Sequence, residues 1–302
     1  MPPVQRPYLA LALRLAAAFV LSTLIMLVKY TAGTGVAFPE ILFWRAALTL
    51  PLLGGWLVWR GELARLRTRR MPAHLRRAVL GMIGMAMTFG APILLPLAES
   101  TTLGFTTPIF AVILSALVLR ERVGLVRWTA VALGFLGVLV IAQPGHSHIP
   151  PLGAAVGLGA GFMVAVISIQ IRDLSRTDEP ISVVFWFSAW STAVFTLLLP
   201  FFVSAHTAQQ WLLLIAIGLL GCLVQLLLTA SLRIGQVASV IVMDYSSLVW
   251  ATAYGWLVWD QLPPTATWLG APLIIGAGAV IAWREHRLHQ RLTPTAAPSG
   301  GE

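Results

Sequence analysis

Long runs of apolar residues, separated by short polar breaks, occupy almost the whole sequence. The breaks fall at prolines, glycines and clusters of arginine, residues that interrupt or border helices. Each run approaches the roughly 20 residues that an α-helix needs to cross the hydrocarbon core of a bilayer. The ten-residue alternating segments of a membrane β-barrel are absent from the sequence. The pattern predicts an all-α membrane protein with ten transmembrane helices, at residues 8–30, 39–59, 75–95, 99–119, 125–142, 152–171, 181–203, 209–230, 236–258 and 266–283.

Composition excludes an ordinary soluble domain. Of the 302 residues, 58% are hydrophobic and 10% are charged, whereas soluble domains carry about a quarter charged residues. The first apolar run is too long for a signal peptide and is not followed by a convincing cleavage site. We therefore expect it to remain as the first helix. Residues 288–302 are polar and contain Pro, Thr and Gly, and we expect them to form a disordered tail.

Basic residues are concentrated in alternate connections between the spans. If the N-terminus is cytoplasmic, 18 of the 20 Lys and Arg residues lie on the cytoplasmic side. The outer connections near residues 144–151 and 204–210 contain none, and only Lys29 and Arg45 remain, within or at the outer ends of spans. Cytoplasmic loops of membrane proteins carry this excess of basic residues. Both termini are therefore predicted to be cytoplasmic, and the net charge of +9 needs no nucleic-acid partner.

The sequence repeats itself with a spacing of 139 to 143 residues. Three segments of the first half return in the same order in the second half: 16–29 in 159–172, 38–47 in 179–189, and 116–124 in 255–263. Each half contains five predicted spans, so the second half enters the membrane from the opposite side. The pattern predicts two inverted five-helix repeats, 8–142 and 152–283, an arrangement found in many secondary transporters.

Residues 106–141, TTPIFAVILSALVLRERVGLVRWTAVALGFLGVLVI, resemble the drug/metabolite transporter superfamily, specifically its ten-helix EamA type. They carry a mid-helix proline at Pro108, a terminal acid at Glu121 and a glycine-bearing fifth helix, as that family does. The second copy is looser, with Asp260 in place of the glutamate. The segments VKY and FPEILFWRA are similar to the branch with S-adenosylmethionine and riboflavin importers, and the superfamily also includes amino-acid exporters. The resemblance implies a secondary transporter with a helix kink at Pro108.

Asp244 is the deepest acidic residue of the predicted spans. Tyr245 and two serines follow it, and no arginine is predicted at its depth. Because a polar group in the hydrocarbon is costly, Asp244 either binds a substrate cation or a proton, or is a structural acceptor for Tyr or Ser groups. Counting back one repeat of 139 residues places Phe105, just before Pro108, at the same level. We therefore expect Asp244 and Tyr245 to line a central cavity where the ninth helix meets the fourth.

Other polar residues fall within the predicted spans or at their ends. Arg45 either clamps a substrate carboxylate or phosphate, or pairs with Glu99 at a similar depth as a gate or brace. The pair is the favoured interpretation, because a lone guanidinium at that depth is expensive. Lys29 either contacts substrate or extends to the outer interface. Gln225 either lines the pathway or hydrogen-bonds a neighbouring helix.

Three tryptophans lie deeper than the others, many of which fall near span ends as in an aromatic belt. These three either stack on a flat or cationic substrate or pack in the core: Trp186, Trp190 and Trp250. The histidines of the outer connections lack a Cys or carboxylate partner at ligand spacing, so no metal site is predicted. The sequence contains neither a glycine-rich phosphate loop with lysine nor a nucleophilic serine motif. We therefore expect neither a cofactor nor enzymatic activity.

The leading hypothesis is a secondary transporter that moves small organic metabolites across the membrane by alternating access. Amino acids or related compounds are the first candidates, because Asp244 suits an ammonium group and Arg45 suits a carboxylate. An importer of a nucleoside-like or flavin-like compound is the alternative, and a membrane receptor or embedded enzyme is an alternative of another class. The expected setting is a bacterial inner membrane, with the lipid bilayer and a metabolite as partners, protons as a candidate coupling ion, and a monomer or weak dimer as the assembly. Import and export both stay open.

The topology can be tested by labelling from each side of the membrane. Thr68→Cys lies in the Arg-rich connection, and Ser147→Cys lies in an outer connection without Lys or Arg. We expect the two cysteines to react with an impermeant maleimide from opposite sides, because basic loops stay cytoplasmic. Reaction of both from one side would contradict the ten-span topology. The parent chain, whose single cysteine Cys222 lies in an apolar run, gives the background.

Overall fold

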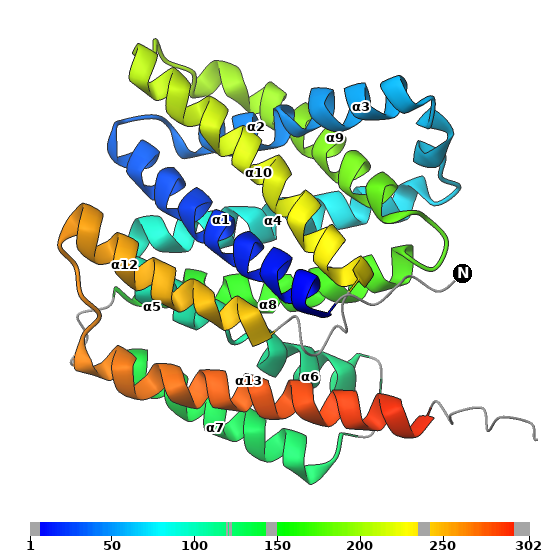
Figure 1. Cartoon of the computed structure of the whole chain (residues 1–302). Helices are drawn as coiled ribbons and strands as arrows, with labels where there is room; N and C mark the ends of the chain where they lie inside the picture. The colour runs from blue at the N-terminus through cyan, green and yellow to red at the C-terminus, as the bar shows by residue number, and fades with distance from the viewer. Residues whose placement is uncertain (1–6, 119, 121–122, 143–149, 235–241, 293–302) are drawn as a thin grey trace, which may run out of the picture.

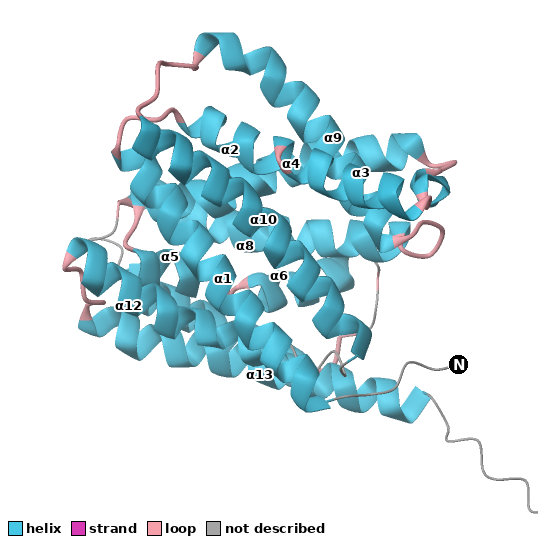
Figure 2. Ribbon diagram, turned by 45° about the horizontal axis from the view of Figure 1, so that its top comes forward, coloured by secondary structure: helices cyan, strands magenta, loops and turns pink. Residues whose placement is uncertain are grey.

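The computed structural model describes residues 7–118, 120, 123–142, 150–234 and 242–292. Every regular element among these residues is a helix (Figures 1 and 2). In chain order the elements are α1 (Pro7–Gly33), α2 (Phe38–Ala47), α3 (Thr49–Arg60), η1 (Leu63–Leu66), α4 (Met71–Leu94), α5 (Leu97–Gly104), α6 (Thr107–Leu117), α7 (Leu125–Ala142), α8 (Pro151–Leu174), α9 (Pro180–Leu198), η2 (Leu199–Phe201), α10 (Ala208–Ile234), η3 (Val242–Ser246), α12 (Ser247–Trp259) and α13 (Thr265–Leu292).

Nine helical stretches within the described residues are long and apolar enough to cross a bilayer. They coincide with nine of the ten predicted spans, and their ends agree within four residues. The remaining prediction, 236–258, is described from Val242 onward as η3 and α12. Its first residues, 236–241, lie outside the described part of the chain.

The last helix is longer than the sequence predicts. Helix α13 continues to Leu292, so the prediction of a disordered tail beginning at residue 288 was wrong for its first five residues. The segment 285–292, EHRLHQRL, is rich in Glu, Arg, Leu and Gln, which are good helix formers. This composition extends the helix although the segment is too polar to stay in the hydrocarbon. Residues 293–302 lie outside the described residues.

The helices pair in a pattern that is unchanged when the two halves of the chain, α1–α7 and α8–α13, are exchanged. Helix α1 packs along α10, and α8 packs along α4 in the equivalent way (Figure 1). Helix α2 packs against α9, and α7 packs against α13, so each of these pairs maps onto itself. All four pairs join one half to the other. The two repeats are therefore combined in a single bundle.

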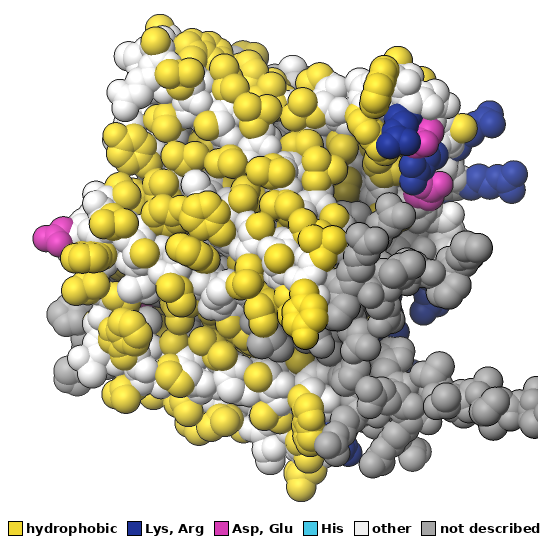
Figure 3. Space-filling model, viewed as in Figure 1, with side chains coloured by type: hydrophobic (Ala, Val, Ile, Leu, Met, Phe, Trp, Pro, Cys, Tyr) yellow, Lys and Arg dark blue, Asp and Glu magenta, His cyan; other side chains and the backbone are white. Residues whose placement is uncertain are grey.

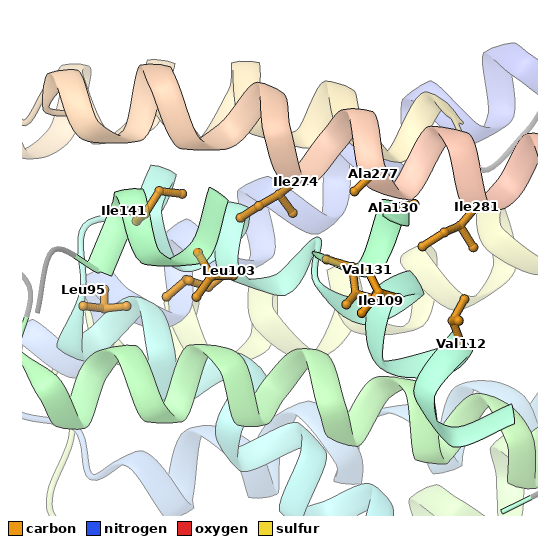
Figure 4. Close-up of a cluster of buried hydrophobic side chains, with 11 residues drawn as sticks. Leu95, Leu103, Ile109, Val112, Ala130, Val131, Ile141, Ile274, Ala277 and Ile281 are labelled. Carbon is orange, nitrogen blue, oxygen red and sulfur yellow. The ribbon is translucent and has the colours of Figure 1, made fainter. Parts of the chain in front are cut away.

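The buried apolar side chains form two clusters. One joins α6, α7 and α13, where Ile109, Val131 and Ile274 are buried (Figure 4). The other joins α1, α2, α4 and α10, and includes Leu24 and Leu214. Lipid tails are as apolar as these side chains, so the helices associate by close packing and polar contacts rather than by the hydrophobic effect. Shape and polar groups therefore decide which helices meet.

The surface is apolar along the helices and basic at one end. Figure 3 shows hydrophobic side chains over the face that α1, α10 and α12 form, with arginine side chains gathered beyond it. We call the end that carries the connection between α3 and α4 the basic end. Helix α1 begins and α13 ends toward it (Figure 1). The other end, where α1 connects to α2 and α9 connects to α10, is the opposite end.

Helices α7 and α13 are in close contact at two glycines, Gly137 and Gly270. A Cβ atom on Gly270 would lie 2.6 Å from the carbonyl oxygen of Gly137 and 2.5 Å from Cγ1 of Ile141. Alanine therefore does not fit unless the helices move apart. We expect Gly270→Ala to lower the free energy of unfolding by about 1–3 kcal/mol, seen as a lower thermal midpoint in detergent.

Gly276→Ala on the same helix is the matched control. A Cβ atom on Gly276 would meet no atom within 4 Å, and alanine is the better helix former by about 1 kcal/mol. Its thermal midpoint should equal or exceed that of the parent chain. Equal destabilisation by both variants would show that the contact between α7 and α13 is not the cause.

Candidate functional site

Asp244 and Arg14 form a two-point ion pair between the halves. Asp244 lies in η3, and Arg14 lies about two turns into α1, which packs against η3. Nε of Arg14 donates to Oδ1 of Asp244 at 2.6 Å, and Nη2 donates to Oδ2 at 2.5 Å. This bidentate geometry is the strong form of an arginine–carboxylate contact. The expectation that no arginine lies at the depth of Asp244 was wrong, because the long Arg14 side chain reaches it from α1.

The polar groups around Asp244 are largely satisfied by their own surroundings. Both carboxylate oxygens accept from Arg14, so a substrate ammonium group would have to displace a guanidinium. The hydroxyl of Ser247 donates to the backbone carbonyl of Asp244 at 2.6 Å, and that of Ser246 donates to the carbonyl of Met243 at 2.7 Å. Asp244 therefore acts here as a link between the halves.

Two interrupted helical stretches meet beside this ion pair. The fourth span is divided into α5 and α6 at Phe105 and Thr106. Pro108 is then within the first two residues of α6, where the missing N–H of proline costs no helical hydrogen bond. The rings of Tyr245 and Phe105 pack edge to face, with their centroids 5.0 Å apart. The Tyr245 hydroxyl lies against Gly278, so η3 contacts the fourth span at the level that the repeat predicts.

Glu99 and Lys29 lie near each other at the opposite end. Glu99 is 1% exposed, and its Oε1 accepts from the hydroxyl of Thr267 in α13 at 3.5 Å. Nζ of Lys29 donates to the backbone carbonyl of Leu95 at 2.7 Å and lies 5.2 Å from the ring centre of Trp259. The two opposite charges attract each other across the start of α5. Lys29, rather than Arg45, is therefore the cation that faces Glu99.

Arg45 contacts a different part of the bundle. Its Nη1 lies 2.8 Å from Sδ of Met85, and its guanidinium carbon lies 4.6 Å from the ring centre of Phe89, both in α4. Among the described residues, no ion pair joins Arg45 to Glu99. The expected pair was wrong because equal depth does not fix direction around a helix. Helix α2 packs on α9 and α10, whereas α5 packs on α8 and α12.

A small cavity lies beside Arg45, between α2, α9 and α10. Thr49, Ser188, Phe187 and Gln225 line it together with Arg45. Its volume is about 10 Å³, which corresponds to about one water molecule. Gln225 therefore lies on the same cavity as Arg45, as a pathway residue would. The site is closed in this structure.

Arg77 is a second arginine within the bundle, and it is not among the candidate residues predicted from the sequence. It lies in α4, about two turns past Met71, and only 9% of it is exposed. Its guanidinium carbon lies 4.5 Å from the ring centre of Phe187. Nε and Nη1 of Arg77 are buried and have no hydrogen-bond partner among the described residues. Because Arg77 lies six residues after the first residue of α4, its position in the helix indicates that it belongs to the bundle and not to the preceding connection.

Two buried histidines contact carboxylates at the two ends of the bundle. At the opposite end, Nε2 of His206 lies 2.5 Å from Oε1 of Glu40, with the side chains 1% and 0% exposed. At the basic end, Nε2 of His74 lies 3.4 Å from Oδ1 of Asp178, with the side chains 1% and 3% exposed. Each histidine lies near the start of α4 or α10, and each acid lies near the start of α9 or α2. Exchanging the halves therefore converts one contact into the other.

Asp178 is held in its charged form. Burial alone would raise the pKa of its carboxyl, but hydrogen bonds from Thr68 and Thr177 and the nearby imidazole of His74 together hold the pKa below its ordinary value. The Thr177 hydroxyl donates to Oδ2 of Asp178 at 2.7 Å. The charge of Asp178 stabilises its contact with His74 above the ordinary carboxyl pKa, and this stabilisation is lost as the pH falls through the depressed pKa.

The three tryptophan candidates lie in different places. Nε1 of Trp186 donates to the backbone carbonyl of Leu66 in η1 at 2.9 Å, at the basic end. Nε1 of Trp190 is buried and has no partner among the described residues. Trp250 packs edge to face on Phe19 and is 37% exposed. The structure therefore does not bring the eight candidate substrate residues together. It also contains no group of three metal-ligating side chains in the described residues.

Comparison with known proteins identifies the family of this two-repeat bundle. The sequence profile of the EamA-like transporter family matches residues 8–143 and again residues 151–283. The pseudopaline exporter CntI of Pseudomonas aeruginosa is 32% identical over 266 residues, which cover 88% of this chain and 93% of the exporter. A riboflavin transporter of Vibrio cholerae is 31% identical over 249 residues, which cover 81% of this chain and 83% of that transporter.

More distant proteins agree with these matches. An S-adenosylmethionine uptake transporter of Rickettsia bellii is 26% identical over 269 residues, which cover 84% of this chain and 87% of that protein. A crystal structure with 22% sequence identity has the same fold, with a TM-score of 0.62 over 94% of this chain and 99% of its own. On the two matches of the family profile, which together span nearly all of the sequence, the chain belongs to the EamA-like transporter family.

Proposed function

We propose that this chain is a secondary transporter that moves small organic metabolites by alternating access. Transporters built from inverted repeats rock their halves around a fixed site and open it to each side in turn. The observation that carries the proposal is the pair of His–carboxylate contacts, His206–Glu40 and His74–Asp178, at opposite ends of the bundle. Each contact joins the first half to the second.

The described state is closed toward both ends. Both His–carboxylate contacts are formed, and the cavity beside Arg45 holds only about 10 Å³. Separation at His206–Glu40 would free the start of α10 from α2 and open the opposite end. Separation at His74–Asp178 would free the start of α4 from the connection before α9 and open the basic end. Protons are the proposed coupling ion, because His–carboxylate contacts depend on the charge of the imidazole.

The proposed setting is the inner membrane of a bacterium, with the basic end and both termini in the cytoplasm. A monomer or weak dimer within the lipid bilayer is the proposed assembly, and the proposed activity is transport rather than catalysis. Similar proteins include an S-adenosylmethionine uptake transporter, a pseudopaline exporter and a riboflavin transporter, so both uptake and export of organic metabolites occur among them. The latter similarity supports uptake of a flavin-like compound as the second candidate function.

Purified protein in proteoliposomes tests the proposal directly. Labelled amino acids, riboflavin and S-adenosylmethionine are offered from each side, with and without an imposed pH gradient. Accumulation of one of them inside the vesicles, or its loss from loaded vesicles, supports transport. Binding without movement across the membrane would indicate a receptor instead.

The two His–carboxylate contacts should control access from opposite sides. The reporter is Ser188→Cys in a Cys222→Ala background, because Ser188 lines the closed cavity beside Arg45. Adding His206→Ala should increase its labelling by an impermeant maleimide from the opposite end, since that variant removes the contact there. Adding His74→Ala should increase labelling from the basic end instead. Increased labelling from the same side in both variants would contradict their roles as alternate closures.

The Arg14–Asp244 pair should show strong coupling between its two members. We expect Asp244→Asn or Arg14→Gln alone to cost about 1.5–3 kcal/mol of stability, because each leaves the other charge unpaired. The double variant should cost less than the sum of the two, measured by thermal unfolding in a double-mutant cycle. Additive losses would argue against direct coupling. Unchanged transport with unchanged pH dependence in Asp244→Asn would remove this carboxylate from the transport mechanism.

A further inference from the structure

We infer that the transported substrate is a small organic carboxylate, bound between the guanidinium groups of Arg45 and Arg77 in the bundle of α2, α4, α9 and α10. The inference rests on the proposed transport for the movement of the substrate, whereas the binding site stands on its own contacts. Helix α9 packs on both α2 and α4, and α10 packs on α2. The two arginines therefore belong to one set of neighbouring helices that both halves contribute.

The two guanidinium groups differ from Arg14 in their partners. Arg14 meets both oxygens of a carboxylate. Arg45 contacts the thioether sulfur of Met85 and the ring of Phe89, and Arg77 contacts the ring of Phe187. Nε of Arg45 and two nitrogens of Arg77 are buried without a hydrogen-bond partner among the described residues. Neither arginine forms an ion pair within the part of the chain that the structure describes.

These partners do not compensate a buried charge. An aromatic ring attracts a cation only modestly. Removal of an ion from water costs a large desolvation free energy, which only a well-placed counter-charge offsets. Ionisable groups within membrane spans that lack this compensation mark substrate and ion pathways. The planar donors of a guanidinium match the two oxygens of a carboxylate. The missing counter-charge is therefore assigned to the substrate.

Phe187 connects the two arginines. The guanidinium carbon of Arg77 lies 4.5 Å from the centre of the Phe187 ring, and the same side chain lines the cavity beside Arg45. A Cβ atom on Gly81 would lie 2.6 Å from the Phe187 ring, and one on Gly221 would lie 3.3 Å from Cγ of Arg45. These glycines are 140 residues apart, which is the spacing of the repeat. Arg45 in the first half thus corresponds to Phe187 in the second. The site therefore has a guanidinium group on the side of the first half and an aromatic ring at the equivalent position of the second half.

The other groups around Arg45 suit an anion. Thr49, Ser188 and Gln225 line the cavity, and no acidic residue of the described part of the chain does. Hydroxyl and amide groups donate hydrogen bonds to a carboxylate without repelling it. The closed cavity is too small for a metabolite, so the halves must separate before one can bind. A single carboxylate between the two cations would then neutralise one of them and hydrogen-bond both.

A larger pocket lies at the basic end. It has a volume of about 970 Å³ and is lined by Arg67, Arg69, Arg70 and Trp186 among others. Asp178 also lines it and contacts His74, which lies one turn before Arg77 on α4. A positively charged mouth concentrates anions near its opening. The arginines of the pocket, then Arg77, then Arg45 form a series of cations from the basic end into the bundle.

Stability without any ligand provides the first test. We expect Arg45→Met and Arg77→Met each to raise the thermal midpoint of the purified protein by about 2 °C or more, because each removes an uncompensated buried charge. Arg14→Met is the matched control and should lower the midpoint, since it leaves Asp244 unpaired. A lower midpoint in Arg45→Met and Arg77→Met, as in the control, would show that these arginines brace the fold and would overturn the inference.

Ligand binding provides the second test. The purified protein is heated with amino acids, hydroxy acids and dicarboxylic acids, and with the primary amide of each. At least one acid should raise the thermal midpoint, its amide should not, and Arg45→Gln should remove the shift. If amides stabilise as well as acids, or no acid in the series stabilises, the carboxylate site is wrong. Stabilisation by an acid that proteoliposomes then fail to move would contradict the transport proposal and leave the binding site intact.

Discussion

A charge inside an apolar bundle needs a compensating partner, and the partners found within the bundle determine how the halves of the chain are joined. Many different arrangements of the helices would allow close packing in lipid, so close packing alone does not select one of them. The Arg14–Asp244 pair selects one of them, because it holds α1 of the first half to η3 of the second. The contacts His206–Glu40 and His74–Asp178 do the same at the two ends. Polar groups therefore specify the pairing that the apolar surfaces permit.

The internal repeat gives these links their arrangement. The two His–carboxylate contacts correspond to each other under exchange of the halves, so the closed ends have similar construction. The middle of the bundle does not share this symmetry. Asp244 of the second repeat corresponds to Phe105 of the first, and Arg45 of the first corresponds to Phe187 of the second. Symmetric contacts at the two ends thus enclose a middle whose charges are not symmetric.

The spans and the repeat could be predicted from the sequence, because bilayer thickness fixes the length of each apolar run and the duplicated segments keep their order. The partners of the polar residues could not. Arg45 and Glu99 have similar depths, but α2 and α5 face different neighbours, and no pattern along the chain records that direction. His206 and Glu40 are 166 residues apart and lie outside or at the ends of the apolar runs. Their contact exists only once the helices are packed.

The proposed binding site and the His74–Asp178 contact at the basic end share helix α4. Asp178 contacts His74 and accepts hydrogen bonds from Thr68 and Thr177. The described partners of Asp178 do not include Arg77. His74 lies one turn before Arg77 on α4, so the contact at the basic end and an arginine that we assign to the substrate share one helix.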